Sequence, residues 1–139
     1  MIKEHPYVLI ELDEHPTCFR PGQAISGRYR LNPSESPAEV QALEWSIAWA
    51  TEGKGDEDQG IHAIETIREP ERGVPQPDQW RRFEVILPMS PLSYEGLIVK
   101  VLWRVRIRAV FGKNCEWVGE LLFRLGDVDR VCEKKDKTP

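Results

Sequence analysis

Apolar and polar residues alternate strictly along residues 97–110, LIVKVLWRVRIRAV. One set of alternate positions is apolar: Val99, Val101, Trp103, Val105, Ile107 and Ala109. The other set is mostly cationic: Lys100, Leu102, Arg104, Arg106 and Arg108. A period of two with β-branched and aromatic residues is typical of a half-buried strand, whereas a helix would scatter the arginines around its circumference.

Residues 115–125, CEWVGELLFRL, continue this pattern after a short break. The break is Gly112-Lys113-Asn114, whose glycine and asparagine tolerate the positive φ angles of a tight turn. We therefore predict a long antiparallel hairpin in which Trp103 and Trp117 are buried.

Five further segments alternate in the same way, and prolines and glycines separate them: residues 6–12, 24–31, 39–51, 60–67 and 80–87. Residues 6–12 and 60–67 alternate less cleanly than the others, and the second of these is a candidate edge strand. With the hairpin, this pattern predicts an all-β, immunoglobulin-like sandwich of seven antiparallel strands.

The segment 39–51 shows how the two faces of a strand are expected to differ. Its inward positions are large and apolar: Leu43, Trp45, Ile47 and Trp49. Its outward positions are small or polar: Ala42, Glu44, Ser46 and Ala48. Such alternation favours one face packed on a core and one face toward solvent.

Two motifs interrupt the strands. Residues 19–27, FRPGQAISG, contain Pro21-Gly22, which favours a tight turn, and Gly27, which indicates a bulge or a close backbone approach. Residues 87–96, LPMSPLSYEG, are stiffened by two prolines, and we expect Tyr94 to anchor this crossover between strands.

These two motifs, followed by LWRVRIRA at residues 102–109, resemble the amino-terminal half of arrestin-like proteins over residues 7–125. The resemblance implies an immunoglobulin-like, arrestin-type sandwich with an adaptor or scaffold role. Arrestins contain two such sandwiches, whereas this chain has room for one, and residues 51–58, TEGKGDED, are not part of the arrestin pattern. The phosphate-sensing basic pair and the polar core of visual arrestins have no counterpart here, so phosphate sensing is not carried over.

The chain of 139 residues is long enough for one hydrophobic core. We expect one domain at residues 1–125, followed by a charged, flexible tail at residues 126–139. The net charge of −4 argues against general nucleic-acid binding. The chain has no apolar run of signal-peptide or membrane-span length, so we expect a cytoplasmic protein without a transmembrane segment.

The three cysteines, Cys18, Cys115 and Cys132, are odd in number and form no CxxC pair. This spacing favours reduced thiols over a zinc or redox site. The histidines, His5, His15 and His62, show no ligand spacing either, so we expect no metal and no cofactor.

The stripe of Lys100, Arg104, Arg106 and Arg108 allows two interpretations. It could bind an acidic partner, or it could form cross-strand ion pairs within the hairpin. A three-residue turn places Arg106 opposite Glu120, and a shift of one pair instead places Arg104 against Glu120 and Arg108 against Glu116. The pattern alone leaves both interpretations open.

A run of acids, Asp56-Glu57-Asp58, lies in a glycine-rich loop beside Lys54. It could hold a hard cation, but it lacks the spacing of an EF-hand, which favours a solvated loop tip.

No nucleophile motif or phosphate-binding loop is present, so the sequence predicts a non-catalytic protein-interaction module of unknown partner rather than an enzyme. Two alternatives remain: an enzyme of unrecognised type, and a self-associating subunit. Homo-oligomerisation is suggested by apolar residues predicted on otherwise polar faces: Ile86, Leu102, Val118 and Leu122.

Overall fold

The computed structural model describes residues 7–14, 18–32, 40–55, 57–68, 78–111 and 115–126. Within these ranges the regular structure is entirely β. The nine strands are β1 (Val8–Leu12), β2 (Cys18–Phe19), β3 (Ala24–Leu31), β4 (Val40–Gly53), β5 (Gln59–Arg68), β6 (Arg81–Ile86), β7 (Tyr94–Glu95), β8 (Val99–Phe111) and β9 (Cys115–Leu125).

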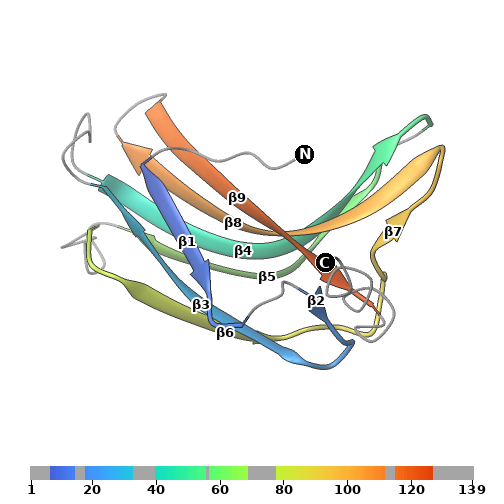
Figure 1. Cartoon of the computed structure of the whole chain (residues 1–139). Coiled ribbons are helices and arrows are strands. Elements are labelled where there is room, and N and C mark those ends of the chain that lie inside the picture. The colour runs from blue at the N-terminus through green and yellow to red at the C-terminus, as the bar shows by residue number, and fades with distance from the viewer. Residues whose placement is uncertain are drawn as a thin grey trace, which may run out of the picture.

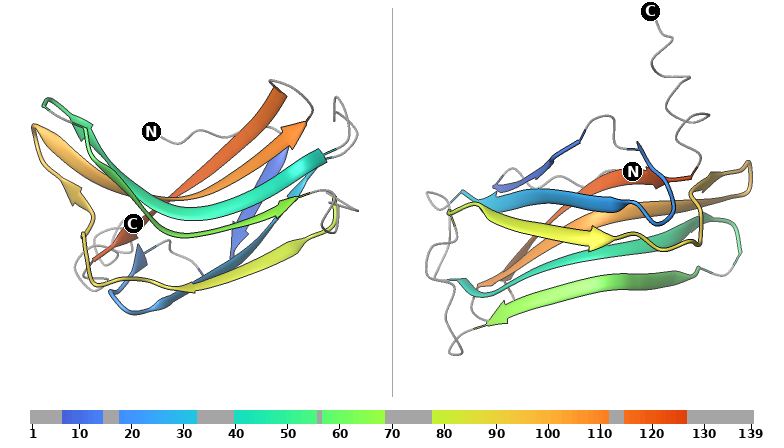
Figure 2. Two further views of the ribbon diagram at one scale, coloured as in Figure 1. Left: turned by 180° about the vertical axis from the view of Figure 1, so that it is seen from behind. Right: turned by 90° about the horizontal axis from the view of Figure 1, so that it is seen from below.

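The strands form two sheets that pack face to face (Figure 1). The small sheet has the order β1-β3-β6, and the large sheet has the order β2-β9-β8-β4-β5, with β7 paired to β8. The large sheet is bowed, and its concave side faces away from the small sheet (Figure 1, Figure 2). The predicted all-β sandwich is therefore confirmed.

The core lies between the inner faces of the two sheets. Trp103 is 1% exposed and Trp117 is 8% exposed, as the sequence predicts. The ring of Trp103 packs against Phe123 at 5.9 Å between centroids, and the ring of Trp117 packs against Phe111 at 4.7 Å. Large apolar side chains at alternate positions thus supply the burial that holds the sheets together.

The long hairpin is confirmed, because β8 pairs antiparallel with β9 from Trp103↔Phe123 to Phe111↔Cys115. Its turn, residues 112–114, lies outside the described residues. The other five predicted strands are also present, and β5 is the last strand of its sheet, as expected of an edge strand.

Two strands, β2 and β7, were not predicted. Each has only two residues, which is too short for a period of two to be visible. In addition, β2 runs parallel to β9, so the expectation of antiparallel strands throughout does not extend to this short strand.

Both glycines singled out in the 19–27 motif have a structural role. Gly22 has a φ of +82° in a turn where the Gln23 amide donates to the carbonyl of Arg20 at 3.0 Å. Gly27 marks a close approach rather than a bulge, because a Cβ there would collide with the backbone oxygen of Glu11.

The 87–96 crossover is held by groups other than the one predicted. The Trp103 indole donates to the carbonyl of Pro91 at 2.7 Å, and the Ser93 hydroxyl accepts from the Leu125 amide at 2.8 Å. Tyr94 is 56% exposed. The Trp103 indole and the Ser93 hydroxyl, each hydrogen-bonded to a backbone group, therefore provide the anchoring that we expected of Tyr94.

The cysteines require a second correction. Cys115 is a free thiol, but Cys18 is disulfide-bonded, so the predicted reduced state is wrong for Cys18. Cys132 lies outside the described residues. Sequence spacing cannot reveal which cysteines the packing of distant segments brings within bonding distance.

Candidate binding groove on the large sheet

The predicted arginine stripe lies on the concave outer face of the large sheet. Arg104, Arg106 and Arg108 point away from the core, because alternate residues of β8 are the buried ones. Lys100 shares this face but lies farther along β8, where it pairs in register with Glu52 and Glu95. The structure therefore groups the three arginines and separates Lys100 from them.

The arginines contact glutamates of β9. The register places Arg106 directly opposite Glu120, yet the side chains also pair diagonally. Nη1 of Arg104 lies 3.2 Å from Oε1 of Glu120, and Nε of Arg108 donates to Oε2 of Glu116 at 2.8 Å. The register thus follows one predicted alternative, while the ion pairs include those of the other.

The pairs differ in strength and burial. Glu120 is 6% exposed and lies between Arg104 and Arg106. The hydrogen bond from Arg108 to Glu116 is the main cause of a raised pKa of Arg108. Arg106 has the loosest pairing of the three, because its Nε lies 3.6 Å from Oε2 of Glu120 and 45% of its side chain is exposed.

Beside this stripe the outer face is hollowed along β4. A hollow of about 440 Å³ lies over the middle of the strand, and another of about 270 Å³ adjoins it at Glu44. We call this combined hollow the β4 groove. Small outward side chains of β4 form its floor: Ala42, Ser46, Ala48 and Ala50. The side chains of the two neighbouring strands rise above this floor and form the walls.

The two walls have different chemistry. The β8 wall contains Arg104, Arg106 and Arg108 and ends with Val110 at the second hollow. The β5 wall begins with Ile61 and Ile64, which are 65% and 51% exposed. It continues with two polar residues, Thr66 and Arg68.

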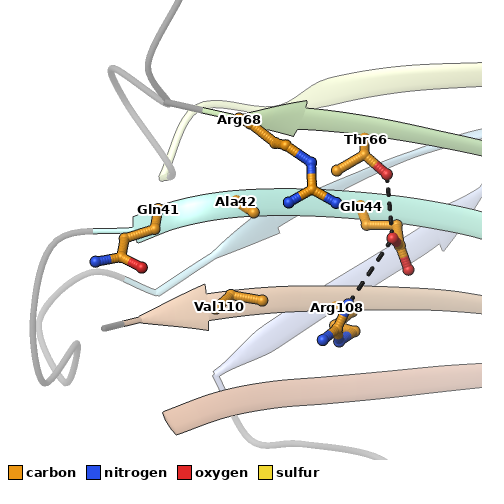
Figure 3. Close-up of a pocket in the computed structure, with 7 residues that line it drawn as sticks. All are labelled: Gln41, Ala42, Glu44, Thr66, Arg68, Arg108 and Val110. Carbon is orange, nitrogen blue, oxygen red and sulfur yellow. Dashed lines mark hydrogen bonds and ion pairs between the residues drawn. The ribbon is translucent and has the colours of Figure 1, made fainter. Parts of the chain in front are cut away.

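At the second hollow Glu44, itself an outward residue of β4, contacts both walls. Figure 3 shows Arg68 reaching from β5 above Ala42, while Glu44 accepts a hydrogen bond from Thr66 at 3.1 Å. Nη1 of Arg108 approaches Glu44 from the other wall at 3.9 Å. One carboxylate is thus shared between both sides of the groove.

The groove is positively charged within an acidic chain. Four arginines and two glutamates line it, which leaves a formal surplus of two positive charges against −4 for the whole chain. Arg106 is 45% exposed and its Nε lies 3.6 Å from Glu120, so its guanidinium remains open to an external ligand after the internal ion pairs have formed.

Sequence reasoning missed the β5 wall, including Arg68. The register shifts opposite Ile47 and Ala48, where β5 has one extra residue, and this irregularity obscures the alternation of β5. A signal was nevertheless present in β4, where every outward residue from Ala42 to Ala50 except Glu44 is alanine or serine. Small side chains in a row leave space on a sheet face unless a neighbouring element fills it.

The other candidate residues do not assemble into a site within the described residues. Asp56, His5 and His15 lie outside them. Glu57 and Asp58 are exposed, and the Asp58 amide donates to the hydroxyl of Thr51 at 2.7 Å. The described part of the chain contains no group of three or more histidine, cysteine or acidic side chains that could hold a metal.

His62 has a structural contact: its Nε2 lies 2.7 Å from the carbonyl oxygen of Ile86, which links β5 to β6. Of the outward apolar residues, Ile86 is exposed, whereas Leu102, Val118 and Leu122 are half-buried. The described ranges contain no helix of the length and apolarity that crossing a membrane requires.

Comparison with known proteins shows similarity at the level of structure. No protein-family model matches the chain, and a search of curated proteins finds no match. The chain is similar to the crystal structure of Spo0M, a sporulation control protein from Bacillus subtilis, with a TM-score of 0.55 and 12% sequence identity. The match covers 87% of this chain and 49% of the other, so this chain spans about half the length of that protein. At such low identity the likeness concerns the fold, and it supports an arrestin-like β-sandwich.

Proposed function

We propose that this domain is a non-catalytic protein-interaction module that binds a partner protein in the β4 groove. The observation that carries the proposal is the groove itself, a hollow with a small-residue floor and an arginine wall on an otherwise acidic chain. Recognition would be non-covalent and would use Arg104, Arg106 and Arg108, with Lys100 contributing only at the far end of the same face.

The electrostatics favour a charged partner surface. An acidic protein repels acidic partners at long range, so only a concentrated cationic patch can attract one. Arginine suits this role because its planar guanidinium donates to two carboxylate oxygens at once. The loosely paired Arg106 is the residue most able to exchange Glu120 for an external carboxylate.

The test is crosslinking from the groove. A photoreactive phenylalanine analogue replaces Ile64 in the groove wall, and a second variant carries it at Leu9, an exposed residue on the outer face of the small sheet. In a native lysate we expect position 64 to crosslink a specific protein that position 9 does not. Adding Arg106→Glu should abolish the crosslink.

The control, Arg28, resembles Arg106 in exposure and also contacts a glutamate. Arg28 lies on the small sheet, is 42% exposed and contacts Glu11 at 2.8 Å. Arg28→Glu should leave crosslinking from position 64 unchanged. Equal crosslinking from positions 9 and 64, or equal loss in both arginine variants, would contradict the proposal.

Self-association is a second candidate function, and one observation favours it. β5 ends its sheet, and all ten of its residues are exposed or half-buried. A long free edge presents unpaired backbone groups to which another strand can add. Sedimentation velocity over a concentration series would test this, because a constant monomer mass up to high concentration would exclude it.

A further inference from the structure

We infer that the β4 groove accepts an extended, acidic segment of the partner, with carboxylates directed to the β8 wall and aliphatic side chains to the β5 wall. This inference rests on the proposed function and names the chemistry of the partner. It follows from the dimensions of the groove, the spacing of its arginines and the contrast between its walls.

The dimensions favour an extended chain over a helix. β5 and β8 flank β4 directly, so their backbones lie about 10 Å apart, two strand spacings. A helix with its side chains is about 10–12 Å across and would rest on the rims rather than on the floor. The β4 residues that line the two hollows run from Ala42 to Ala50, about 27 Å, which matches eight or nine residues in extended conformation. Glu44 interrupts this floor between Ala42 and Ser46, so the segment must pass over its side chain.

The β8 wall determines where the acidic side chains would lie. Arg104, Arg106 and Arg108 are two residues apart on one strand, which spaces them by about 6–7 Å. An extended ligand presents side chains on one side with the same spacing. Acidic residues at alternate positions would therefore meet successive arginines.

The β5 wall determines which ligand side chains would lie on the side opposite the arginines. Ile61 and Ile64 are more than half exposed and lie across the floor from the arginines. Aliphatic side chains at the remaining alternate positions would cover them, and burying this area would contribute to affinity. A segment that is acidic along both sides would leave these isoleucines in contact with charge.

The glutamates in and beside the groove restrict which ligand segments can bind. Glu120 occupies part of the donor capacity of Arg104 and Arg106, and Glu116 does the same for Arg108, from which Glu44 lies farther away at 3.9 Å. The four arginines and these three glutamates leave a net positive charge, so a basic segment would be repelled. A ligand carboxylate must compete with Glu120, which makes binding dependent on correct placement rather than on charge alone.

The experiment uses three nine-residue peptides with blocked ends and a fluorescent label, titrated against the full chain by anisotropy. The first alternates glutamate and valine, the second has the same composition in two blocks, and the third alternates lysine and valine. We expect the first to bind at least about tenfold more tightly than the other two, with affinity that falls as salt rises.

Variants of the chain identify the walls. Arg106→Ala and Ile64→Ser should each weaken binding of the alternating acidic peptide at least about fivefold, since each removes one wall contact. Arg28→Ala, on the other sheet, should leave binding unchanged. Circular dichroism of each variant establishes that the fold is retained.

The outcomes separate this inference from the proposed function. Equal binding of the blocked peptide, tighter binding of the lysine peptide, or no binding of the acidic peptide would each overturn the inference. If position 64 still crosslinks a partner in that case, the groove is a binding site with different chemistry. If the crosslink is absent as well, both proposals fail.

Discussion

The outer faces of the two sheets carry the same kinds of side chain but pack them differently. On the small sheet, Arg28 contacts Glu11 at 2.8 Å, and both side chains are about half exposed. The ring of Trp80 covers this face, with Cζ of Arg28 and of Arg30 at 4.0 and 4.9 Å from its centroid. The arginines of the small sheet are thus used in surface pairs and stacking.

On the large sheet the arginines surround a buried carboxylate and a hollow. Glu120 is almost inaccessible, and the neighbouring β4 presents alanine and serine where the small sheet presents a tryptophan. Arginine–glutamate pairs therefore do not by themselves identify a binding face. The size of the side chains next to them decides whether a partner can approach the guanidinium groups.

The largest expected difference between the outer faces of the two sheets is the loss of unfolding free energy when a glutamate is replaced by alanine. Glu120→Ala should lower the free energy of unfolding by about 2–4 kcal/mol, because it leaves two arginines unpaired around a buried position. Glu11→Ala should cost less than about 1 kcal/mol, because the Arg28–Glu11 pair is solvated. Urea denaturation of both variants measures this, and equal costs would mean that the two faces do not differ electrostatically.

A smaller effect is expected at the ring that covers the small sheet. Trp80→Ala should cost about 1–2 kcal/mol, because it removes two cation–π contacts and the partial burial of a half-exposed ring. Partner binding in the β4 groove should not change. Thermal unfolding together with the peptide titration checks both statements, and a loss of peptide affinity would show that the faces are coupled.

The matched arginines sharpen the comparison further. Arg106→Ala and Arg28→Ala should each lower the free energy of unfolding by at most about 1 kcal/mol, since both arginines are partly exposed and Glu120 keeps its contact with Arg104 when Arg106 is removed. Their stability effects should therefore be similar, whereas only Arg106→Ala should weaken binding in the groove. A cost above about 2 kcal/mol for Arg106→Ala would instead make this residue primarily structural.

The smallest effect concerns pH. Hydrogen bonds from Arg82 and then Ser26 hold the pKa of Asp13 below its ordinary value of 3.8. A carboxyl group with a lowered folded-state pKa contributes stability above pH 3.8 and loses it as pH falls through the folded value. The difference in unfolding free energy between wild type and Asp13→Asn should therefore be constant near neutral pH and shrink below pH 3.8. A difference that is unchanged in acid would contradict this.

The sequence by itself determined which segments are strands and which of their residues face the core. These properties are local, because side chains in a strand point alternately to opposite sides wherever the strand lies. Trp103, Trp117, Leu43 and Ile47 are accordingly buried as their periodicity predicts. Gly22 likewise adopts the positive φ that its turn requires, since only the adjacent residues define that turn.

Only the tertiary structure decided which strands, and which of their side chains, are neighbours. The β4 groove exists because β5 and β8 both pair with β4, although β8 begins more than forty residues after β4 ends. The parallel contact of β2 with β9, the disulfide at Cys18 and the contacts of Glu44 with Thr66 and Arg108 likewise depend on distant segments (Figure 3). Periodicity indicates the direction of a side chain but not the identity of the neighbouring strand. The arginines and the small residues of β4 could therefore be placed on outward faces, whereas their position side by side could not be predicted.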